Sequence, residues 1–192
     1  GAGTVLNTID LGEKDSLVVF GTGAVGLSAV MAAKLSGAKA IVAVDINESR
    51  LDLALELGAT HVVNAKSDDV HEQMLAACGG GAQYSFETSG VDSALEEAIN
   101  CLAMEGVCGM VTVPHYGEKF PFTPFGVFVK AATLRGIFFG SSVPRVFLPK
   151  LIEYYLAGQF PYDKLIQTYQ FADINQAIAD TVSGKVIKPV RS

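Results

Sequence analysis

The sequence predicts an α/β fold, a doubly wound parallel six-stranded sheet with helices on both faces. Short runs rich in valine, isoleucine and leucine alternate with amphipathic helical stretches along the chain, as expected for strands joined by crossover helices. The mean hydropathy of +0.35 is high for a water-soluble chain. Strands that are covered by helices on both faces would explain this value.

Capping and breaking residues divide the chain into elements. Asn47 is suited to begin a helix, Gly37 and Gly58 to end one, and Pro114 to close the fifth strand. Strands are expected at residues 17–20, 41–44, 61–64, 84–87, 107–113 and 133–139. Helices are expected at residues 24–36, 48–57, 70–78, 93–102, 144–156 and 173–181.

A boundary between two parts of the chain is expected near Gly140. The stretch 114–125 before it is too rich in proline, glycine and aromatic residues to form an element. Residues 16–140 would form the core of the sheet domain. Residues 141–192, with the last two helices and a closing strand at 186–190, would form a C-terminal appendage.

The composition excludes several classes of protein. The 192 residues carry a formal net charge of −6 and are 49% hydrophobic, so the chain can bury a core and is not disordered. Its apolar runs stay far below the roughly 18 residues that cross a membrane. No cluster of lysine and arginine offsets the acidic balance, as binding to nucleic acid would require. Neither a membrane nor a nucleic acid is therefore expected as a partner.

The cysteines and histidines predict no metal site within this chain. Cys78, Cys101, Cys108 and the three histidines fall at no spacing that is typical of metal ligands. An odd number of cysteines without a signal peptide is typical of reduced, buried thiols in a cytoplasmic protein. Because the first residue is Gly1 and not methionine, we expect a processed chain or a piece of a longer protein.

A glycine-rich turn follows the first predicted strand. Gly21, Gly23 and Gly26 form a G-x-G-x-x-G pattern in which the next helix opens, and Asp45 closes the second strand 19 residues after Gly26. Alone the pattern is weak, but strand, helix and acid together are typical of a dinucleotide-binding loop.

Each residue of this pattern has a mechanical reason. Gly21 permits the tight turn, Gly23 lets the backbone approach a pyrophosphate, and Gly26 lets the helix pack closely on the sheet. The start of the helix offers unpaired N–H groups and the positive end of its dipole. Asp45 would accept hydrogen bonds from the adenosine ribose. Arg50 has two interpretations that stay open here, a solvated surface charge or a contact to the ribose or the adenine edge.

The rest of the chain lacks the catalytic patterns of common enzymes. It contains no Tyr-x-x-x-Lys pair, no Gly-x-Ser-x-Gly elbow and no spaced His–Asp relay. Glu87, at the end of the fourth strand, is expected only to satisfy polar groups there. The residues therefore predict a chain that holds a cofactor without catalytic groups of its own.

Several longer blocks resemble one family. The chain is similar to the coenzyme-binding Rossmann domain of zinc-containing medium-chain alcohol dehydrogenases, and most similar to their aryl- or benzyl-alcohol branch. The resemblance covers essentially the whole chain. It rests on residues 1–4, 18–27, 44–51, 57–64, 86–90 and 183–190, and for the branch on 158–163 and 174–177.

The resemblance assigns roles by position. It implies that Ala24 and Val25 offer backbone N–H groups beside the pyrophosphate, that Ile46 flanks the adenine, and that Arg50 lies beside the ribose. It also implies that Lys188 lies near the pyrophosphate, where an arginine is usual. Further residues are implied along the cofactor. These are Thr88 and Ser89 on the adenosine side, and Val111, Thr112, Val113, Phe138 and Phe139 near the nicotinamide.

In that family, an N-terminal domain holds the catalytic zinc through cysteine and histidine, and its last ligand lies just before the position matching Gly1. The resemblance therefore implies a piece that begins after the catalytic half, with residues 144–192 packing back on it and zinc only in the missing domain. It implies NAD in preference to NADP, a primary alcohol, aromatic ones included, or its aldehyde as substrate, and a homodimer or tetramer. The isolated chain would be inactive.

Two other functions stay open at this point. One is a zinc-independent reductase of the same superfamily, similar to quinone reductases. The other is a non-enzymatic dinucleotide-binding or redox-sensing module that regulates a partner.

Overall fold

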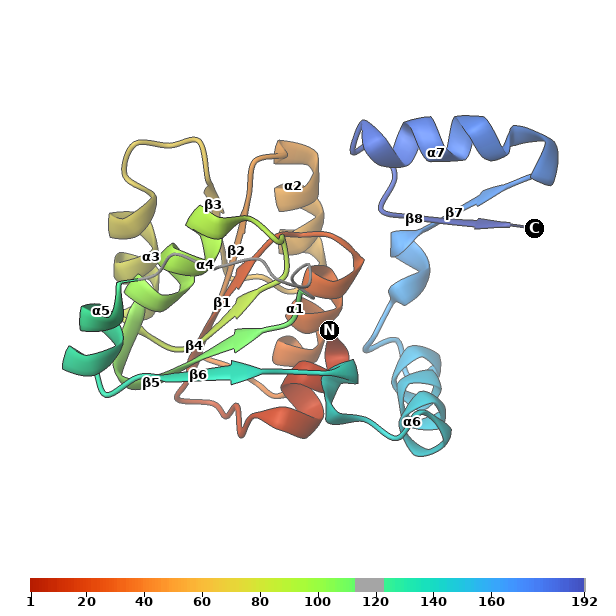
Figure 1. Ribbon diagram of the computed structural model, residues 1–192. Coiled ribbons are helices and arrows are strands. Elements are labelled where there is room, and N and C mark those ends of the chain that lie inside the picture. Colours follow the sequence, from red (N-terminus) through yellow and green to blue (C-terminus); the bar gives the residue numbers. More distant parts are fainter. Residues whose placement is uncertain (113–122, 192) are drawn as a thin grey trace.

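The computed structural model describes residues 1–112 and 123–191. Within these ranges, a parallel sheet has the strand order β3-β2-β1-β4-β5-β6 (Figure 1). The predicted doubly wound six-stranded sheet is thereby confirmed. Its strands are β1 (Ser16–Phe20), β2 (Ala40–Asp45), β3 (His61–Asn64), β4 (Ala82–Glu87), β5 (Leu102–Met110) and β6 (Thr133–Gly136).

Helices cover both faces of this sheet (Figure 1). Alternate residues of a strand point to opposite faces, and β1 shows this plainly. Leu17 and Val19 pack in a cluster with side chains of α1 and α2, whereas Val18 and Phe20 pack with those of α3 and α4. The helices are α1 (Ala24–Leu35), α2 (Glu48–Leu57), α3 (Val70–Cys78), α4 (Asp92–Asn100), α5 (Pro124–Val129), α6 (Pro144–Leu156) and α7 (Ile174–Val182).

The last part of the chain forms a second, smaller sheet. β7 (Ile166–Tyr169) and β8 (Lys188–Arg191) pair in parallel, and α7 accompanies them beside the main sheet (Figure 1). β7 was not predicted from the sequence, and the closing strand was expected at 186–190. The division into two domains near residue 140 stays a prediction. No helix in the described ranges is long and apolar enough to span a membrane.

The fifth strand differs most from its prediction. β5 begins at Leu102 and ends at Met110, so the expected helix 93–102 stops at Asn100 and the strand ends before residues 111–113. Leu102 already pairs with Ala82, and the register then shifts before the next pairs. Glu105, inside this irregular stretch, has a φ of +61°. Such a bulge hides the start of a strand from a search for regular alternation.

Two further elements around β6 were predicted wrongly. The first residues of α5 lie in the stretch that was expected to form no element, although a proline at the start of a helix is favourable. The sixth strand was expected to reach residue 139 but ends at Gly136. Phe139, Gly140 and Ser141 have φ values of +48°, +57° and +49°, which a strand cannot adopt.

Candidate functional site

The glycine turn lies at the carboxyl end of β1. Gly21 has a φ of +89°, and its N–H donates to the carbonyl of Val44 at 2.8 Å. This bond joins the turn to the end of β2. α1 begins at Ala24, and among the described residues no side chain caps its start. The first amides of α1 are therefore free to meet a ligand.

The three glycines differ in the space that a side chain would find. A Cβ on Gly26 would stand 1.8 Å from the carbonyl oxygen of Gly21, which is backbone and cannot yield cheaply. A Cβ on Gly21 would meet the backbone of Ser89 at 3.0 Å. A Cβ on Gly23 would have no atom of the described residues within 4 Å, apart from Gly23 itself and its two chain neighbours. Gly26 is thus needed for packing, whereas Gly23 faces open space at the start of α1.

Asp45 is bound to the same turn. Its Oδ2 atom accepts hydrogen bonds from the N–H and the hydroxyl of Thr22, both at 2.6 Å. Its Oδ1 atom accepts one from the N–H of Asn47 at 3.0 Å. Thr22 is completely buried, at 0% exposure. The glycine turn and the ribose-binding candidate are therefore one hydrogen-bonded unit, and sequence reasoning missed Thr22 as its link.

The end of β4 supports the turn from the other side. The hydroxyl of Thr88 donates to the carbonyls of Phe20 and Gly21 at 2.8 and 2.9 Å. Buried Glu87 accepts bonds at one oxygen from both donors of Ser89 and from the N–H of Gly90. The structure confirms that Glu87 satisfies polar groups at the strand end. The structure also brings Thr88 and Ser89 to the glycine turn. Their hydroxyl groups already donate hydrogen bonds to oxygen atoms of the protein.

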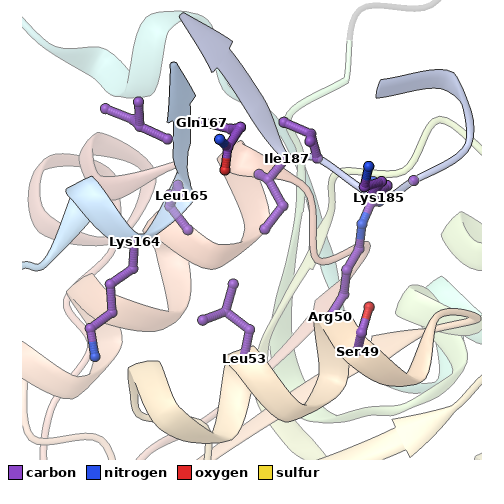
Figure 2. A pocket seen from close by; sticks show the side chains of 11 residues that line it. Ser49, Arg50, Leu53, Lys164, Leu165, Gln167, Lys185 and Ile187 are labelled. Atoms are coloured by element: carbon purple, nitrogen blue, oxygen red, sulfur yellow. The ribbon is translucent and has the colours of Figure 1, made fainter. Parts of the chain in front are cut away.

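Ile46 follows Asp45 directly, and Arg50 lies four residues further along the chain, in α2. Ile46 is 59% exposed. The Nε atom of Arg50 is buried and has no hydrogen-bond partner among the described residues, so this side chain is not simply a solvated charge. It lines a pocket of about 180 Å³ between α2 and the turn at Gly184 and Lys185. Figure 2 shows Arg50 reaching from α2 toward Lys185.

The remaining candidates follow other strands. The N–H of Val111 donates to the carbonyl of Glu87 at 3.2 Å, and Thr112 follows in a bend, while Val113 lies outside the described residues. Phe138 and Phe139 are 75% and 74% exposed, with ring centroids 4.5 Å apart in an edge-to-face arrangement.

Because the strands are parallel, the residues that follow β1, β2, β4, β5 and β6 lie along one edge of the sheet. The chain order reverses between β1 and β4, and ligands of such sheets bind at this reversal. The glycine turn, Asp45 and Thr88 meet at that point. Lys188 is the exception, because it lies exposed in β8, outside the main sheet.

The buried thiols offer no nucleophile to this site. Burial raises the pKa of Cys108 to about 11 and raises the pKa of Cys101 well above its usual value. Both thiols therefore stay protonated at neutral pH, as expected for structural cysteines. Across residues 1–112 and 123–191, no three side chains of His, Cys, Asp or Glu gather closely enough to hold a metal ion.

Comparison with protein-family models matches residues 24–154 to the family described as zinc-binding dehydrogenase. The geraniol dehydrogenase of Castellaniella defragrans is 40% identical over 191 residues, which are 99% of this chain and 51% of that protein. The alcohol dehydrogenase 2 of Zea mays is 34% identical over 98% of this chain and 50% of its own length. The chain thus spans about half the length of the curated relatives that it matches.

Solved structures agree with these sequence matches. The benzyl alcohol dehydrogenase of Acinetobacter calcoaceticus superposes with a TM-score of 0.95 at 39% identity, over 100% of this chain and 53% of that one. An alcohol dehydrogenase zinc-binding domain protein of Burkholderia ambifaria gives a TM-score of 0.95 at 44% identity, over 99% of this chain and 51% of that one.

Proposed function

The chain belongs to the zinc-binding dehydrogenase family, and from this membership we propose that it binds NAD and positions the nicotinamide for an alcohol dehydrogenase. One observation carries the proposal. The open start of α1 at Gly23 and the carboxylate of Asp45 are joined by hydrogen bonds through Thr22. A pyrophosphate needs the first feature and an adenosine ribose needs the second.

Each described group has a task in this proposal. The first amides of α1, those of Ala24 and Val25 among them, bind the pyrophosphate, and the absence of a Cβ at Gly23 lets it come close. Asp45 accepts a hydrogen bond from a ribose hydroxyl. The exposed side chain of Ile46 covers the adenine, and Arg50 lies beside the ribose. The bound NAD supplies the acceptor for a hydride, and the protein supplies its orientation.

The nicotinamide half of the cofactor would follow the same edge of the sheet. Val111 and Thr112 follow β5, and Phe138 and Phe139 follow β6, at the carboxyl ends of these strands. We propose that these residues, together with Val113, hold the carboxamide. Lys188 would approach the pyrophosphate from β8. As a lysine it offers a single charged contact where an arginine could form two parallel bonds.

We propose a primary alcohol or its aldehyde as the substrate of the whole enzyme, aromatic ones included. The relatives named for geraniol and for benzyl alcohol support this class. The zinc that would polarise the alcohol oxygen is expected outside this chain. The three cysteines are free thiols, which supports a cytoplasmic location for the protein.

The chain alone is expected to hold no stoichiometric zinc and to oxidise no alcohol, because the described residues bring no set of metal ligands together. Metal analysis of the purified chain and an assay for NADH with benzyl alcohol and NAD test this expectation. About one zinc per chain, or steady alcohol-dependent formation of NADH, would contradict it.

We also propose that two copies join through β6. This strand forms an edge of the sheet within the described residues, and a free edge can pair with its two-fold mate. Next to it in sequence, α5 exposes Phe125 and Phe128 by 70% and 84%. Aromatic side chains exposed to this extent are typical of a surface that a partner covers.

Phe128→Glu is therefore expected to convert a dimer into a monomer, because it places a charge in the apolar surface beside β6. Light scattering at tens of micromolar measures the mass of both forms. Phe171→Glu is the matched control, since Phe171 is 64% exposed near α7 and should leave the dimer intact. A wild-type chain that is monomeric at this concentration counts against the interface.

A further inference from the structure

The contact between Thr22 and Asp45 has a consequence for cofactor choice. We propose that Thr22 is a positioning residue, which orients the carboxylate of Asp45 toward the adenosine ribose and so determines the preference for NAD over NADP. This inference rests on the proposed binding of NAD. It assigns a role to a residue at a variable position of the glycine pattern, between Gly21 and Gly23.

The carboxylate of Asp45 is held at both oxygens. An ionised carboxylate offers about four acceptor positions. Oδ2 uses two of them for the amide and the hydroxyl of Thr22, and Oδ1 uses one for the amide of Asn47. One acceptor position is therefore left for a ligand, and it lies on Oδ1. With three donors fixed in the protein, the carboxylate cannot rotate freely, so this position keeps a constant direction.

Burial makes the hydroxyl of Thr22 hard to replace. Thr22 is 0% exposed, so water cannot easily supply the bond to Oδ2 if the hydroxyl is removed. Valine has nearly the shape of threonine and keeps the backbone N–H, which donates the other bond at 2.6 Å. Thr22→Val thus removes one donor to Asp45 and leaves the remaining contacts of the turn in place.

The two cofactors should respond differently to the loss of this donor. NAD gains from the fixed carboxylate, because a ribose hydroxyl donates to the free position on Oδ1. The 2′-phosphate of NADP carries about −1.5 to −2 charges and gains nothing from a carboxylate in that place. A carboxylate that turns more freely therefore binds NAD more weakly and leaves NADP unchanged. Bonds to charged groups contribute enough for about a tenfold effect.

Calorimetric titration of NAD and NADP into the wild-type chain and its variants tests this inference, with thermal unfolding measured in parallel. Thr22→Val should weaken NAD about tenfold and NADP less than twofold. Thr22→Ser keeps the hydroxyl and should bind NAD with an affinity within about twofold of the wild type. Thr22→Ala is a second variant without the hydroxyl and should show the same change in the NAD to NADP ratio, even if Thr22→Val folds poorly.

Asp45→Asn separates the action of Thr22 on Asp45 from a general effect on the loop. In this background, Thr22→Val should change NAD affinity by less than about twofold, because the charge that Thr22 orients is gone. The same tenfold loss in both backgrounds would overturn the inference. So would an unchanged NAD to NADP ratio in Thr22→Val and Thr22→Ala, whatever their melting temperatures.

Other results would refute the proposed function itself. If the wild-type chain does not bind NAD, or if Asp45→Asn retains the wild-type ratio of NAD to NADP affinity, the assignment of the ribose site itself is wrong, and the inference about Thr22 falls with it. If both of these tests succeed while Thr22→Val behaves as wild type, only the role of Thr22 is refuted.

Discussion

Replacing Gly23 with alanine is expected to abolish most NAD binding while leaving the stability of the chain unchanged. Gly23 has an ordinary φ of −74°, and no described atom lies within 4 Å of the position that the new Cβ would take. The methyl group would stand where the pyrophosphate approaches the first amides of α1. We expect a loss of about a hundredfold in affinity, which corresponds to about 3 kcal/mol, and a change in unfolding free energy below about 0.5 kcal/mol.

Gly26→Ala is the matched control for this prediction, because it adds the same methyl group three residues further along the same turn. There the Cβ would lie 1.8 Å from the carbonyl oxygen of Gly21, so the turn or α1 must move. We expect a loss of about 3 kcal/mol in the free energy of unfolding, the upper end of the usual range for overpacking. Denaturant unfolding and calorimetric titration measure both variants. A Gly23→Ala chain that binds NAD like the wild type would refute the site.

Asp45→Asn is expected to weaken NAD by about 1–3 kcal/mol, the usual loss for a hydrogen bond to a charged group, and to strengthen NADP. In the wild type, a phosphate of roughly −2 charges would lie about 4 Å from the carboxylate. At an effective dielectric constant of about 20, each pair of unit charges at this distance costs about 4 kcal/mol before screening. Arg50, five residues after Asp45 and in α2, would attract the phosphate and is expected to soften this discrimination without reversing it.

The choice of asparagine follows from the contacts of the carboxylate. Asp45→Ala would leave two buried donors of Thr22 without a partner, at a cost of about 1–3 kcal/mol each in stability. Asparagine keeps an oxygen that can accept both bonds of Thr22. Its NH2 group takes the place of Oδ1, so the charge, the acceptor of the Asn47 N–H and the acceptor left for the ribose are lost together. Titration of both cofactors into the two variants separates binding from folding. An Asp45→Asn chain with the wild-type preference would contradict the assignment of the ribose site.

The first part of the fold could be predicted closely from the sequence. The helices α2 and α3 have the predicted bounds because local residues set their ends. The side chain of Asn47 accepts the N–H of Ser49 at 3.0 Å, while Gly58 and Gly79 adopt the positive φ values that end a helix. Such signals act within a few residues, so no knowledge of the distant chain is needed.

The elements that were missed depend on distant partners. β7 is short, and it forms only because β8 lies beside it, about twenty residues later in the chain. The start of β5 is defined by its pairing with Ala82 across a bulge. The end of β6 depends on Phe139, whose positive φ is unusual for a residue other than glycine. None of these features leaves a periodic pattern in the sequence.

The candidate site, like the fold, could be predicted from the sequence only in part. The spacing from Gly21 to Asp45 predicts which backbone turns and strand ends meet, because parallel strands place their carboxyl ends together. The spacing does not show which side chains bind each other. The bonds from Thr22 to Asp45 and the unpartnered Nε of Arg50 become visible only in the structure. The one sign of the Thr22–Asp45 bonds in the sequence was the hydroxyl residue between the first two glycines.

Titration calorimetry of the unmodified chain with NAD and with NADP measures whether this domain binds NAD and prefers it to NADP. We expect one NAD site per chain and an affinity for NAD at least about tenfold higher than for NADP. No saturable binding of either dinucleotide, or equal affinities for the two, would contradict it.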